Sequence, residues 1–304
     1  MRELSIRIDP AGDGRTVLSL LRQELACSDA HIARLKRRET GIRLNGTRCY
    51  VTARVRAGDE LTVEIGDEPD GHIVPMAYPL EIRYEDEDLL VLNKPAGIAV
   101  HQSTRDPEEL TLENAVCHYL GGTICPHPVS RLDRGTSGLM AFAKSGYIHE
   151  RLRRQMHSEG YQRVYLGIAC GRVDPPGGSI TLPIGMAEGS TYRRAICPNG
   201  QSARTDYETL FFRNRFTLLR LVPQTGRTHQ LRLHMAAIGF PLAGDWLYGA
   251  EDRALIARPA LHSYELILTH PISGERIRLT AGLPQDMRSL MDGSNAAVRE
   301  KESK

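Results

Sequence analysis

The sequence predicts an α+β protein in which a domain with an antiparallel core follows a smaller N-terminal unit. Short β-rich runs, separated by many turn residues, are typical of antiparallel strands. Two segments, at 111–120 and 146–157, are expected to be helices. A length of 304 residues is typical of about two domains and allows a sizeable core.

The first unit is expected to span residues 1–66. Apolar residues at helical spacing predict a helix over 15–25, and an N-cap serine predicts a second helix over 28–38. An Asn-Gly pair between two strand-like runs predicts a hairpin over 41–51. A final strand is expected at 58–65.

An acidic stretch with proline and glycine predicts a linker over 67–80, before a large domain at 81–288. The polar composition of 289–304 predicts a disordered tail. Strands of the large domain are expected at 89–93, 139–143, 164–169, 216–222, 264–268 and 276–280.

Composition favours a cytoplasmic protein, because no apolar run is long enough for a membrane span and the N-terminus lacks a signal-peptide pattern. Six scattered cysteines without a Cys-x-x-Cys pair argue against a metal site and a disulfide framework. We therefore expect no metal and no cofactor.

The net charge of +2 says little about partners, but its distribution is uneven. Residues 131–172 contain eight Lys/Arg against three acids, and 193–234 contain eight arginines against two acids, whereas 81–88 contains five acids and one arginine. Such segregation is typical of a basic face that contacts a phosphate backbone. A merely solvated charged surface remains an equal alternative.

Asp133 is the strongest candidate for a functional carboxylate. It lies at the centre of Arg-Leu-Asp-Arg-Gly-Thr-Ser-Gly at 131–138, between a proline-containing loop and the predicted strand at 139–143. The flanking arginines favour the ionised carboxylate, and the glycines allow the backbone to approach a ligand closely. Taken alone, an aspartate between two arginines more often belongs to a surface loop with ion pairs, and it is the rest of the chain that favours a functional site.

Several segments together resemble the RluA family of RNA pseudouridine synthases, over about residues 80–287. Besides 131–138, they occur in the order typical of the family at 84–101, with its Lys94-Pro turn, and then at 163–171, 225–234 and 244–249. Many relatives have histidine where this chain has Ser130, which weakens any role for that side chain but not for Asp133.

The resemblance implies a central mixed sheet, mainly antiparallel, with the active site in a cleft across it. It implies that Asp133 is the catalytic carboxylate and that Arg232 pairs with it through a guanidinium fork. Tyr165 would stack on the target base or its sugar and could relay a proton. A core tyrosine and a surface arginine are the structural alternatives for these two.

Further residues are expected to bind RNA or to support the loop. Arg131 resembles the arginine that fills the gap left by an extruded base, since guanidinium planes stack well on bases. Arg134 is a further candidate for an RNA contact in the large domain. Five other residues are expected either to bind phosphate of the RNA or to brace the loop: Lys94, His101, Arg227, His229 and Gln230.

The first unit resembles the S4-type RNA-binding domain, more loosely than the large domain resembles its family. Its phosphate contacts would be Arg34, Lys36, Arg37 and Arg38, although a solvated helix end explains this run equally well. We expect a monomer whose partner is RNA. Ribosomal RNA is favoured because relatives often combine these domains, and transfer RNA remains open.

Three functional classes follow. A uridine isomerase needs no cofactor, and its carboxylate could attack C1′ of the sugar or remove a proton from C2′. An inactive RNA-binding relative is disfavoured by the intact Asp133, Tyr165 and Arg232. A nucleosidic or glycosidic hydrolase would usually need a second carboxylate, for which Asp245 and the stretch 85–88 are the candidates.

Overall fold

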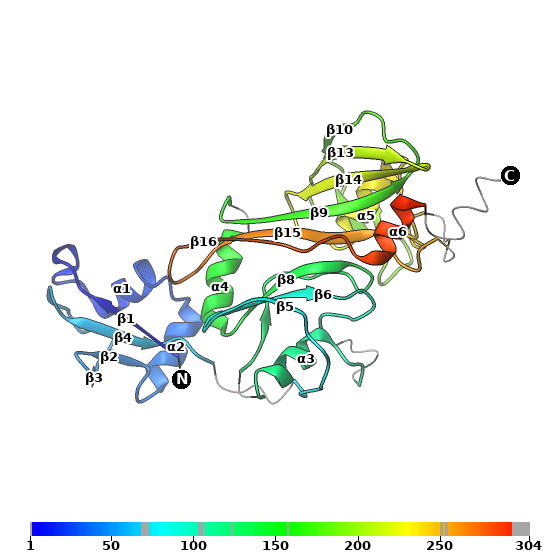
Figure 1. Ribbon diagram of the computed structural model, residues 1–304. Helices are drawn as coiled ribbons and strands as arrows, with labels where there is room; N and C mark the ends of the chain where they lie inside the picture. The colour runs from blue at the N-terminus through cyan, green and yellow to red at the C-terminus, as the bar shows by residue number, and fades with distance from the viewer. Residues whose placement is uncertain are drawn as a thin grey trace.

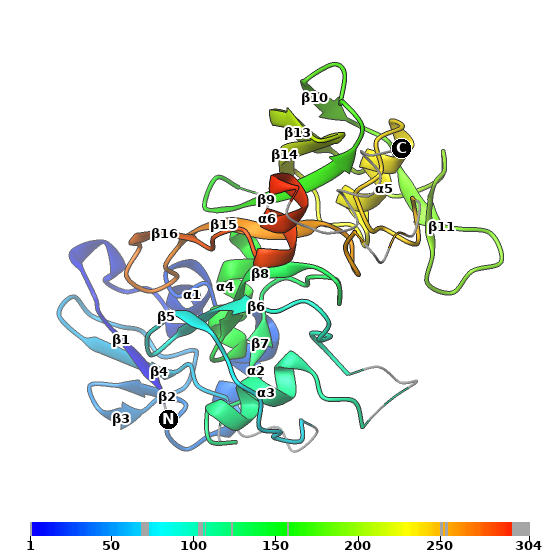
Figure 2. The same cartoon turned by 45° about the vertical axis from the view of Figure 1, so that its right-hand side comes forward.

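The computed structural model describes residues 2–67, 73–102, 106, 108–122, 124–156, 158–249, 252 and 255–293. A four-stranded sheet at the N-terminal end and a ten-stranded sheet form its two β-structures, with a separate two-stranded ribbon. Figures 1 and 2 show the small sheet at one end of the molecule and strands β10, β13 and β14 at the other. This architecture confirms the predicted α+β class.

The N-terminal sheet has the order β1-β4-β2-β3 and is covered by two helices. Thr16 and Ser28 cap the helices with their side chains, as the pattern of the sequence predicted for Ser28. The elements are β1 (Glu3–Arg7), the short 3₁₀ helix η1 (Pro10–Gly12), α1 (Val17–Gln23), α2 (Asp29–Arg37), β2 (Ile42–Leu44), β3 (Thr47–Arg48) and β4 (Glu60–Glu64).

The predicted hairpin forms, but its second arm is shorter than expected. Asn45 and Gly46 both have positive φ, as a two-residue hairpin turn requires. After β3 the chain leaves the sheet, because the carbonyls of Val51 and Ala53 accept hydrogen bonds from the first amides of α1. From Val51 onward, hydrogen bonds to α1 therefore take the place of pairing with β2.

The large sheet is antiparallel except where β15 pairs with β8 in parallel. Its strands lie in the order β10 (Gly177–Ile180), β13 (Thr205–Arg213), β14 (Phe216–Pro223), β9 (Tyr161–Cys170), β15 (Leu261–Thr269), β8 (Ser137–Ala143), β6 (Leu89–Lys94) and β5 (Ile82–Glu85), with β16 (Arg276–Thr280) beside β15 and β7 (His127–Pro128) beside β8. The ribbon consists of β11 (Ile184–Met186) and β12 (Arg194–Ile196). The helices of this part are α3 (Leu112–Tyr119), α4 (Gly146–Gln155), α5 (Gln230–Ala237) and α6 (Gln285–Asp292).

All six predicted strands of the large domain are present, as are both predicted helices. The predicted boundary at 288 is wrong, because α6 continues to Asp292 and buries Leu290 and Met291 in a core against the sheet. The rest of the predicted tail, 294–304, lies outside the described residues.

Both faces of the large sheet are buried at β6. In β6, Leu89 and Val91 belong to one hydrophobic core, whereas Leu90 and Leu92 belong to another, as the two-residue period of a strand dictates. The first core continues into the N-terminal unit and includes Leu21 of α1. The N-terminal unit therefore shares its core with the large domain.

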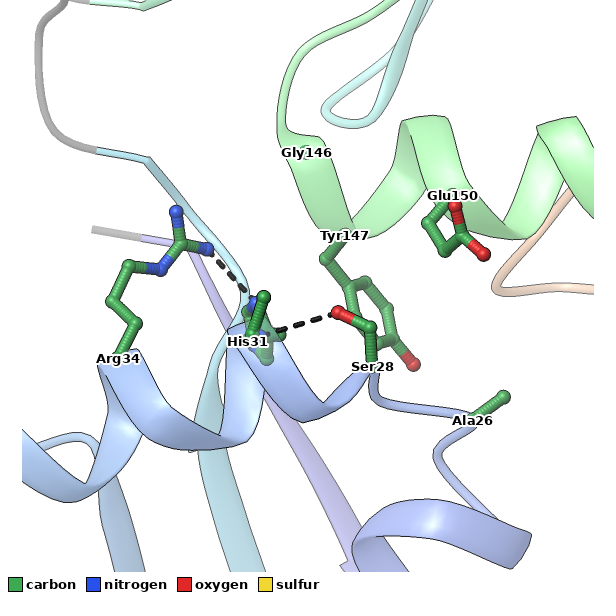
Figure 3. Close-up of a pocket in the computed structure, with 8 residues that line it drawn as sticks. Ala26, Ser28, His31, Arg34, Gly146, Tyr147 and Glu150 are labelled. Carbon is green, nitrogen blue, oxygen red and sulfur yellow. Dashed lines mark hydrogen bonds between the residues drawn. The ribbon is translucent and has the colours of Figure 1, made fainter.

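Helix α4 forms much of this contact. Leu25 lies in the loop between α1 and α2, and its carbonyl accepts a hydrogen bond of 2.6 Å from the hydroxyl of Tyr147. Figure 3 shows Tyr147 facing the start of α2, where His31 accepts a hydrogen bond from Arg34. The two units leave between them a pocket of about 350 Å³.

The structure at Asp67 differs from the predicted linker, because this residue contacts both units. Its buried carboxylate accepts hydrogen bonds from Arg34 of α2, from His127 of β7 and from the backbone amide of Gly146 at the start of α4. Burial opposes ionisation of Asp67, but these partners outweigh it and lower its pKa to about 2. Residue 67 therefore fastens the two units together.

The segment after the undescribed residues 68–72 is also anchored. The amide of Asn114 in α3 donates to the carbonyl of Val74 at 2.8 Å, and the amide of Met76 donates to the carbonyl of Asn114. Within the described residues, no helix is long and apolar enough to cross a bilayer.

Candidate active site

The loop that carries Asp133 joins β7 to β8 and is held by its backbone carbonyls. Nζ of Lys94 donates to the carbonyls of Thr136 at 2.9 Å, Arg134 at 3.2 Å and Pro95 at 2.9 Å. The amide of Gly97 also donates to the carbonyl of Arg134. These bonds tie the loop to the end of β6 and fix the position of its backbone.

Lys94 was predicted to contact RNA, and the structure contradicts this. The side chain is only 1% exposed, and its hydrogen-bond partners in the described part of the chain are all carbonyls of the protein. Burial lowers its pKa to about 7, against the attraction of the Asp133 carboxylate. Lys94 is therefore a brace under the loop, the alternative that the sequence left open.

A second cation braces the same loop from the other side. Nη1 of Arg258 donates to the carbonyl of Gly135 at 3.2 Å and to that of Leu261 at 3.1 Å. At the start of β8, Gly138 has a φ of +113°, and a Cβ there would lie 2.3 Å from the carbonyl oxygen of Ser263. Only glycine permits the close parallel pairing of β8 with β15 at this point.

Arg232 reaches this loop from α5. Its Nη1 donates to Oδ2 of Asp133 at 3.2 Å, although 99 residues separate them in the chain. The arginine side chain is 6% exposed and that of Asp133 is 28% exposed, so the carboxylate lies at the open end of the pair. Within the described part of the chain, Oδ1 of Asp133 accepts no hydrogen bond.

The start of α5 is positioned by Gln230. Its side-chain carbonyl accepts from the hydroxyl of Thr225 and from the amide of Arg227, while its amide donates to the carbonyl of Arg204. His229 precedes it with a left-handed backbone, φ 58°. The sequence allowed Gln230 either to bind phosphate or to brace the structure, and these contacts show that it braces.

Asp245 is the partner of Arg232 that sequence reasoning missed. Oδ2 accepts from Nε of Arg232 and Oδ1 from its Nη2, both at 2.7 Å, while the amides of Leu247 and Tyr248 also donate to Oδ1. The side chain is 0% exposed. A buried carboxylate committed to these donors does not fit the second, acid-base carboxylate of a hydrolase. The Gly-Asp turn at 244–245 was the available signal.

An aromatic ring covers the guanidinium. The ring centroid of Tyr248 lies 5.4 Å from Cζ of Arg232, and its hydroxyl contacts Nδ1 of His229 at 2.9 Å. Burial opposes the charge of Arg232, but Asp245 and Asp133 outweigh it and raise the pKa of the guanidinium. Burial lowers the pKa of His229, against the attraction of Asp133. His229 therefore lines the site as a neutral imidazole at pH 7.

Tyr165 lies in β9, opposite Leu221 of β14 and Ser263 of β15. It is buried in the same hydrophobic core as Leu132, the residue before Asp133. No hydrogen bond joins Tyr165 to Asp133 among the described residues. The structure thus places the tyrosine in a core that also contains a residue of the loop, without a polar contact to the carboxylate among the described residues.

The other predicted RNA contacts of the large domain lie at the surface. Arg131 and Arg227 are exposed, and Nε of Arg227 donates to the carbonyl of Ser202. Arg134 forms a two-pronged ion pair with Glu109, whose Oε2 lies 2.7 Å from its Nη2. His101 contacts Glu113 at 3.0 Å.

The basic run of α2 divides into two pairs. Arg34 binds Asp67, and Arg38 binds Glu64, so both guanidinia are occupied within the protein. Lys36 and Arg37 are exposed. The prediction of four phosphate contacts therefore needs correction, because ion pairs with carboxylates of the protein occupy two of the four cations.

In the described ranges, no three His, Cys, Asp or Glu side chains converge as metal ligands would. Two groups at the loop could take part in chemistry: the partly exposed carboxylate of Asp133 and the buried guanidinium of Arg232. The surrounding residues position these two groups.

Comparisons with known proteins agree on one family. A family model for RNA pseudouridylate synthases matches residues 88–237, which include Asp133, Tyr165 and Arg232. The uncharacterized RNA pseudouridine synthase YhcT of Bacillus subtilis is 35% identical over 294 residues, covering 95% of this chain and 96% of that protein. Ribosomal large subunit pseudouridine synthase D of Yersinia pestis is 36% identical, covering 81% and 80%. The solved structure of human RNA pseudouridylate synthase domain containing 1 has a TM-score of 0.57 at 26% identity, covering 77% of this chain and 98% of that chain.

Proposed function

Because this chain belongs to the RluA family of RNA pseudouridine synthases, we propose that Asp133 supplies the carboxylate with which it isomerises uridine in RNA. The observation that carries this assignment is the pair formed by Asp133 and Arg232, with a 3.2 Å hydrogen bond between segments 99 residues apart. The arginine is buried and the carboxylate is partly open, so a ligand would meet Asp133 first.

The reaction breaks the bond between C1′ and N1 of uridine and forms a bond between C1′ and C5. The proton from C5 is lost, N1 gains a proton, and no electrons are exchanged. Addition of the carboxylate to C1′ and removal of a proton from C2′ both start from an anionic oxygen near the sugar. Oδ1 of Asp133 suits either route, because Arg232 engages only Oδ2.

Tyr165 and Arg131 complete the proposal. Stacking of the target nucleotide on Tyr165 is supported by the position of the tyrosine in the core beside the Asp133 loop. Arg131 is exposed and two residues from Asp133, where a stacking guanidinium could fill the space of an extruded base. Extrusion costs a few kcal/mol, which contacts of this kind would offset.

Ribosomal RNA is the proposed substrate. The support is that Ribosomal large subunit pseudouridine synthase D of Yersinia pestis is 36% identical over 81% of this chain. Transfer RNA is the alternative that the mapping experiment below distinguishes.

The N-terminal unit, residues 1–66, is proposed as an S4-like RNA-binding domain. Its exposed Lys36 and Arg37 supply the phosphate contacts, and its shared core with the large domain holds it in a fixed orientation. Arg34 and Arg38 position the helix rather than the RNA, since both bind carboxylates of the protein.

We further propose that the enzyme acts as a monomer in the cytoplasm. The support for a monomer is that Asp133, Arg232 and Asp245 all come from one chain. Light scattering of the purified protein tests this directly.

Two measurements test the function. Pseudouridine mapping of total RNA from cells with and without the gene should reveal sites in ribosomal RNA that depend on it. The purified enzyme should convert uridine in that RNA without releasing free uracil. Release of uracil would instead support a hydrolase, and sites confined to transfer RNA would overturn the proposed substrate.

A further inference from the structure

We propose that Asp245 is a positioning residue that presents Arg232 to Asp133 end-on, so that one oxygen of the catalytic carboxylate stays free for the sugar. The inference rests on the proposed role of Asp133. The carboxylates of Asp245 and Asp133 both bind the guanidinium of Arg232, but they bind it differently.

A guanidinium offers two edges on which a carboxylate can form two parallel hydrogen bonds. Asp245 occupies the edge formed by Nε and Nη2, with both distances at 2.7 Å. Asp133 receives a single bond from Nη1 at 3.2 Å. The longer and single bond belongs to the residue assigned to the chemistry.

Asp245 is itself fixed. The amides of Leu247 and Tyr248 donate to its Oδ1 at 3.1 and 3.3 Å. The preceding Gly244 has a φ of +70°, and a Cβ there would lie 2.4 Å from the carbonyl oxygen of Arg258. The turn can therefore approach Arg258, which also braces the Asp133 loop.

Without the Asp245 carboxylate, the Nη1–Nη2 edge of Arg232 would be free to turn toward Asp133 and to bind both of its oxygens. Such a pair would engage Oδ1, the oxygen that both routes of the reaction need. Asp245 also balances the charge of Arg232, so the net negative charge of the three groups lies on the more exposed Asp133. The structure thus assigns Asp245 the task of keeping Asp133 reactive.

The test is a double-mutant cycle in the full-length enzyme, with tritium release from 5-tritiated uridine RNA as the assay. Asp245→Asn retains the size of the side chain but removes its charge and replaces one of the two acceptor oxygens with an NH2 donor, so the two parallel bonds to Arg232 cannot both form. We expect kcat per folded molecule to fall about 30- to 100-fold, the cost of misplacing a reacting group by about 1 Å. KM and the Kd for RNA should change less than about threefold, because phosphate contacts carry the affinity.

The same substitution in an Arg232→Met background should cost less than about threefold, because Asp245 acts through the arginine. A purely structural role would instead give the same loss in both backgrounds and would overturn the proposal. Retention of at least half of wild-type kcat by Asp245→Asn would overturn it too.

Glu265→Gln is the matched control. Glu265 in β15 is also buried and accepts from Nε of Arg278 at 2.6 Å, without touching the guanidinium of Arg232. Its kcat should stay within about twofold of wild type. Circular dichroism at the assay temperature gives the folded fraction for every variant.

If Asp245→Asn does not fold, Asp245→Glu tests the positioning role instead. It keeps the charge but displaces the carboxylate by one methylene, and positioning requires at least about a tenfold loss of kcat. An unchanged kcat would contradict the proposal.

Asp133→Asn separates the two assignments. If it remains active, the proposed function of Asp133 fails and this inference fails with it. If it is inactive while Asp245→Asn is fully active, only the present inference fails.

Discussion

Asp67 and His127 form a 2.7 Å hydrogen bond that joins the end of the N-terminal unit to the strand before the Asp133 loop. The carboxylate also binds Arg34 and the first amide of α4. The end of the N-terminal unit is therefore bonded directly to β7, the strand that leads into the loop with the proposed catalytic carboxylate.

His127→Gln should destabilise the protein in acid more than in alkali. Burial opposes the charged imidazole, but Asp67 and Cys125 outweigh it and raise the pKa of His127 from 6.5 to about 9. Because the folded-state pKa is raised, the stabilisation is complete below about pH 6.5 and disappears as the pH rises through 9. Asp67 remains ionised across this window, since its pKa is about 2.

Denaturant unfolding at pH 5.5 and 9.5 measures this effect. We expect a loss of about 1–2 kcal/mol at pH 5.5, reduced by solvent screening because the imidazole is 28% exposed, and a much smaller loss at pH 9.5. His118→Gln, on the exposed face of α3 and without an ion pair among the described residues, is the control for the loss of a surface histidine. An equal loss for His127→Gln at both pH values would contradict the role of the ion pair.

Charge reversal of Lys36 and Arg37 should weaken RNA binding in the full chain. The two exposed side chains would account for about two phosphate contacts, so the salt slope, d log K/d log[salt], should fall in magnitude by about 1 to 2. Removal of residues 1–66 is a poorer test, because it would expose the shared core at Leu89 and Val91. Filter binding at several salt concentrations gives the slopes.

The matched control reverses Arg276 and Arg288, which are exposed on β16 and α6. If both double variants lose affinity and slope equally, the N-terminal unit has no particular role in RNA binding.

Lys94→Met should impair both stability and catalysis. Three carbonyls would lose their common donor, which predicts a loss of about 2–4 kcal/mol in the free energy of unfolding. A loosened loop should lower kcat about 100-fold for the remaining folded enzyme. Lys144→Met is the control, because Lys144 donates to the carbonyl of Asp86 outside the loop. Equal kcat values for the two variants would show that Lys94 does not position Asp133.

Gly138→Ala should cost at least about 3 kcal/mol of stability, because its Cβ would meet the carbonyl of Ser263 at 2.3 Å and its φ is +113°. Gly274→Ala is the control. Its φ is +74° but open space surrounds the Cβ position, so it should cost only about 1–2 kcal/mol. Thermal denaturation compares the two, and similar losses would mean that the steric contact has no energetic consequence.

The local sequence pattern was sufficient to predict the helices and strands that bury regular runs of apolar residues. β6 and β8 have nearly continuous apolar sequences because both faces of their sheet are covered. β13 was missed because its outer half is exposed on both sides and its polar and apolar residues do not alternate cleanly. α5 was missed because all but its last residues are buried, so it lacks a polar face.

The site was less accessible to sequence reasoning. The pairing of Asp133 with Arg232 followed from the resemblance, since no local pattern joins residues 99 positions apart. The burial of Asp245 depends on how the 244–248 turn packs, which its sequence does not encode. The ion pairs of Arg34 and Arg38 were not predictable from local pattern either, because their carboxylate partners lie 33 and 26 residues away in the chain.

The most direct test of the central claim compares Asp133→Asn with the wild type for tritium release and RNA binding. Asparagine keeps the size and a hydrogen-bond acceptor for Arg232 but lacks the anionic oxygen that either route needs. We predict that tritium release falls below detection while the Kd for RNA changes less than about threefold, because phosphate contacts carry the affinity. Residual turnover above a few per cent of wild type would contradict the assignment of Asp133 as the catalytic carboxylate.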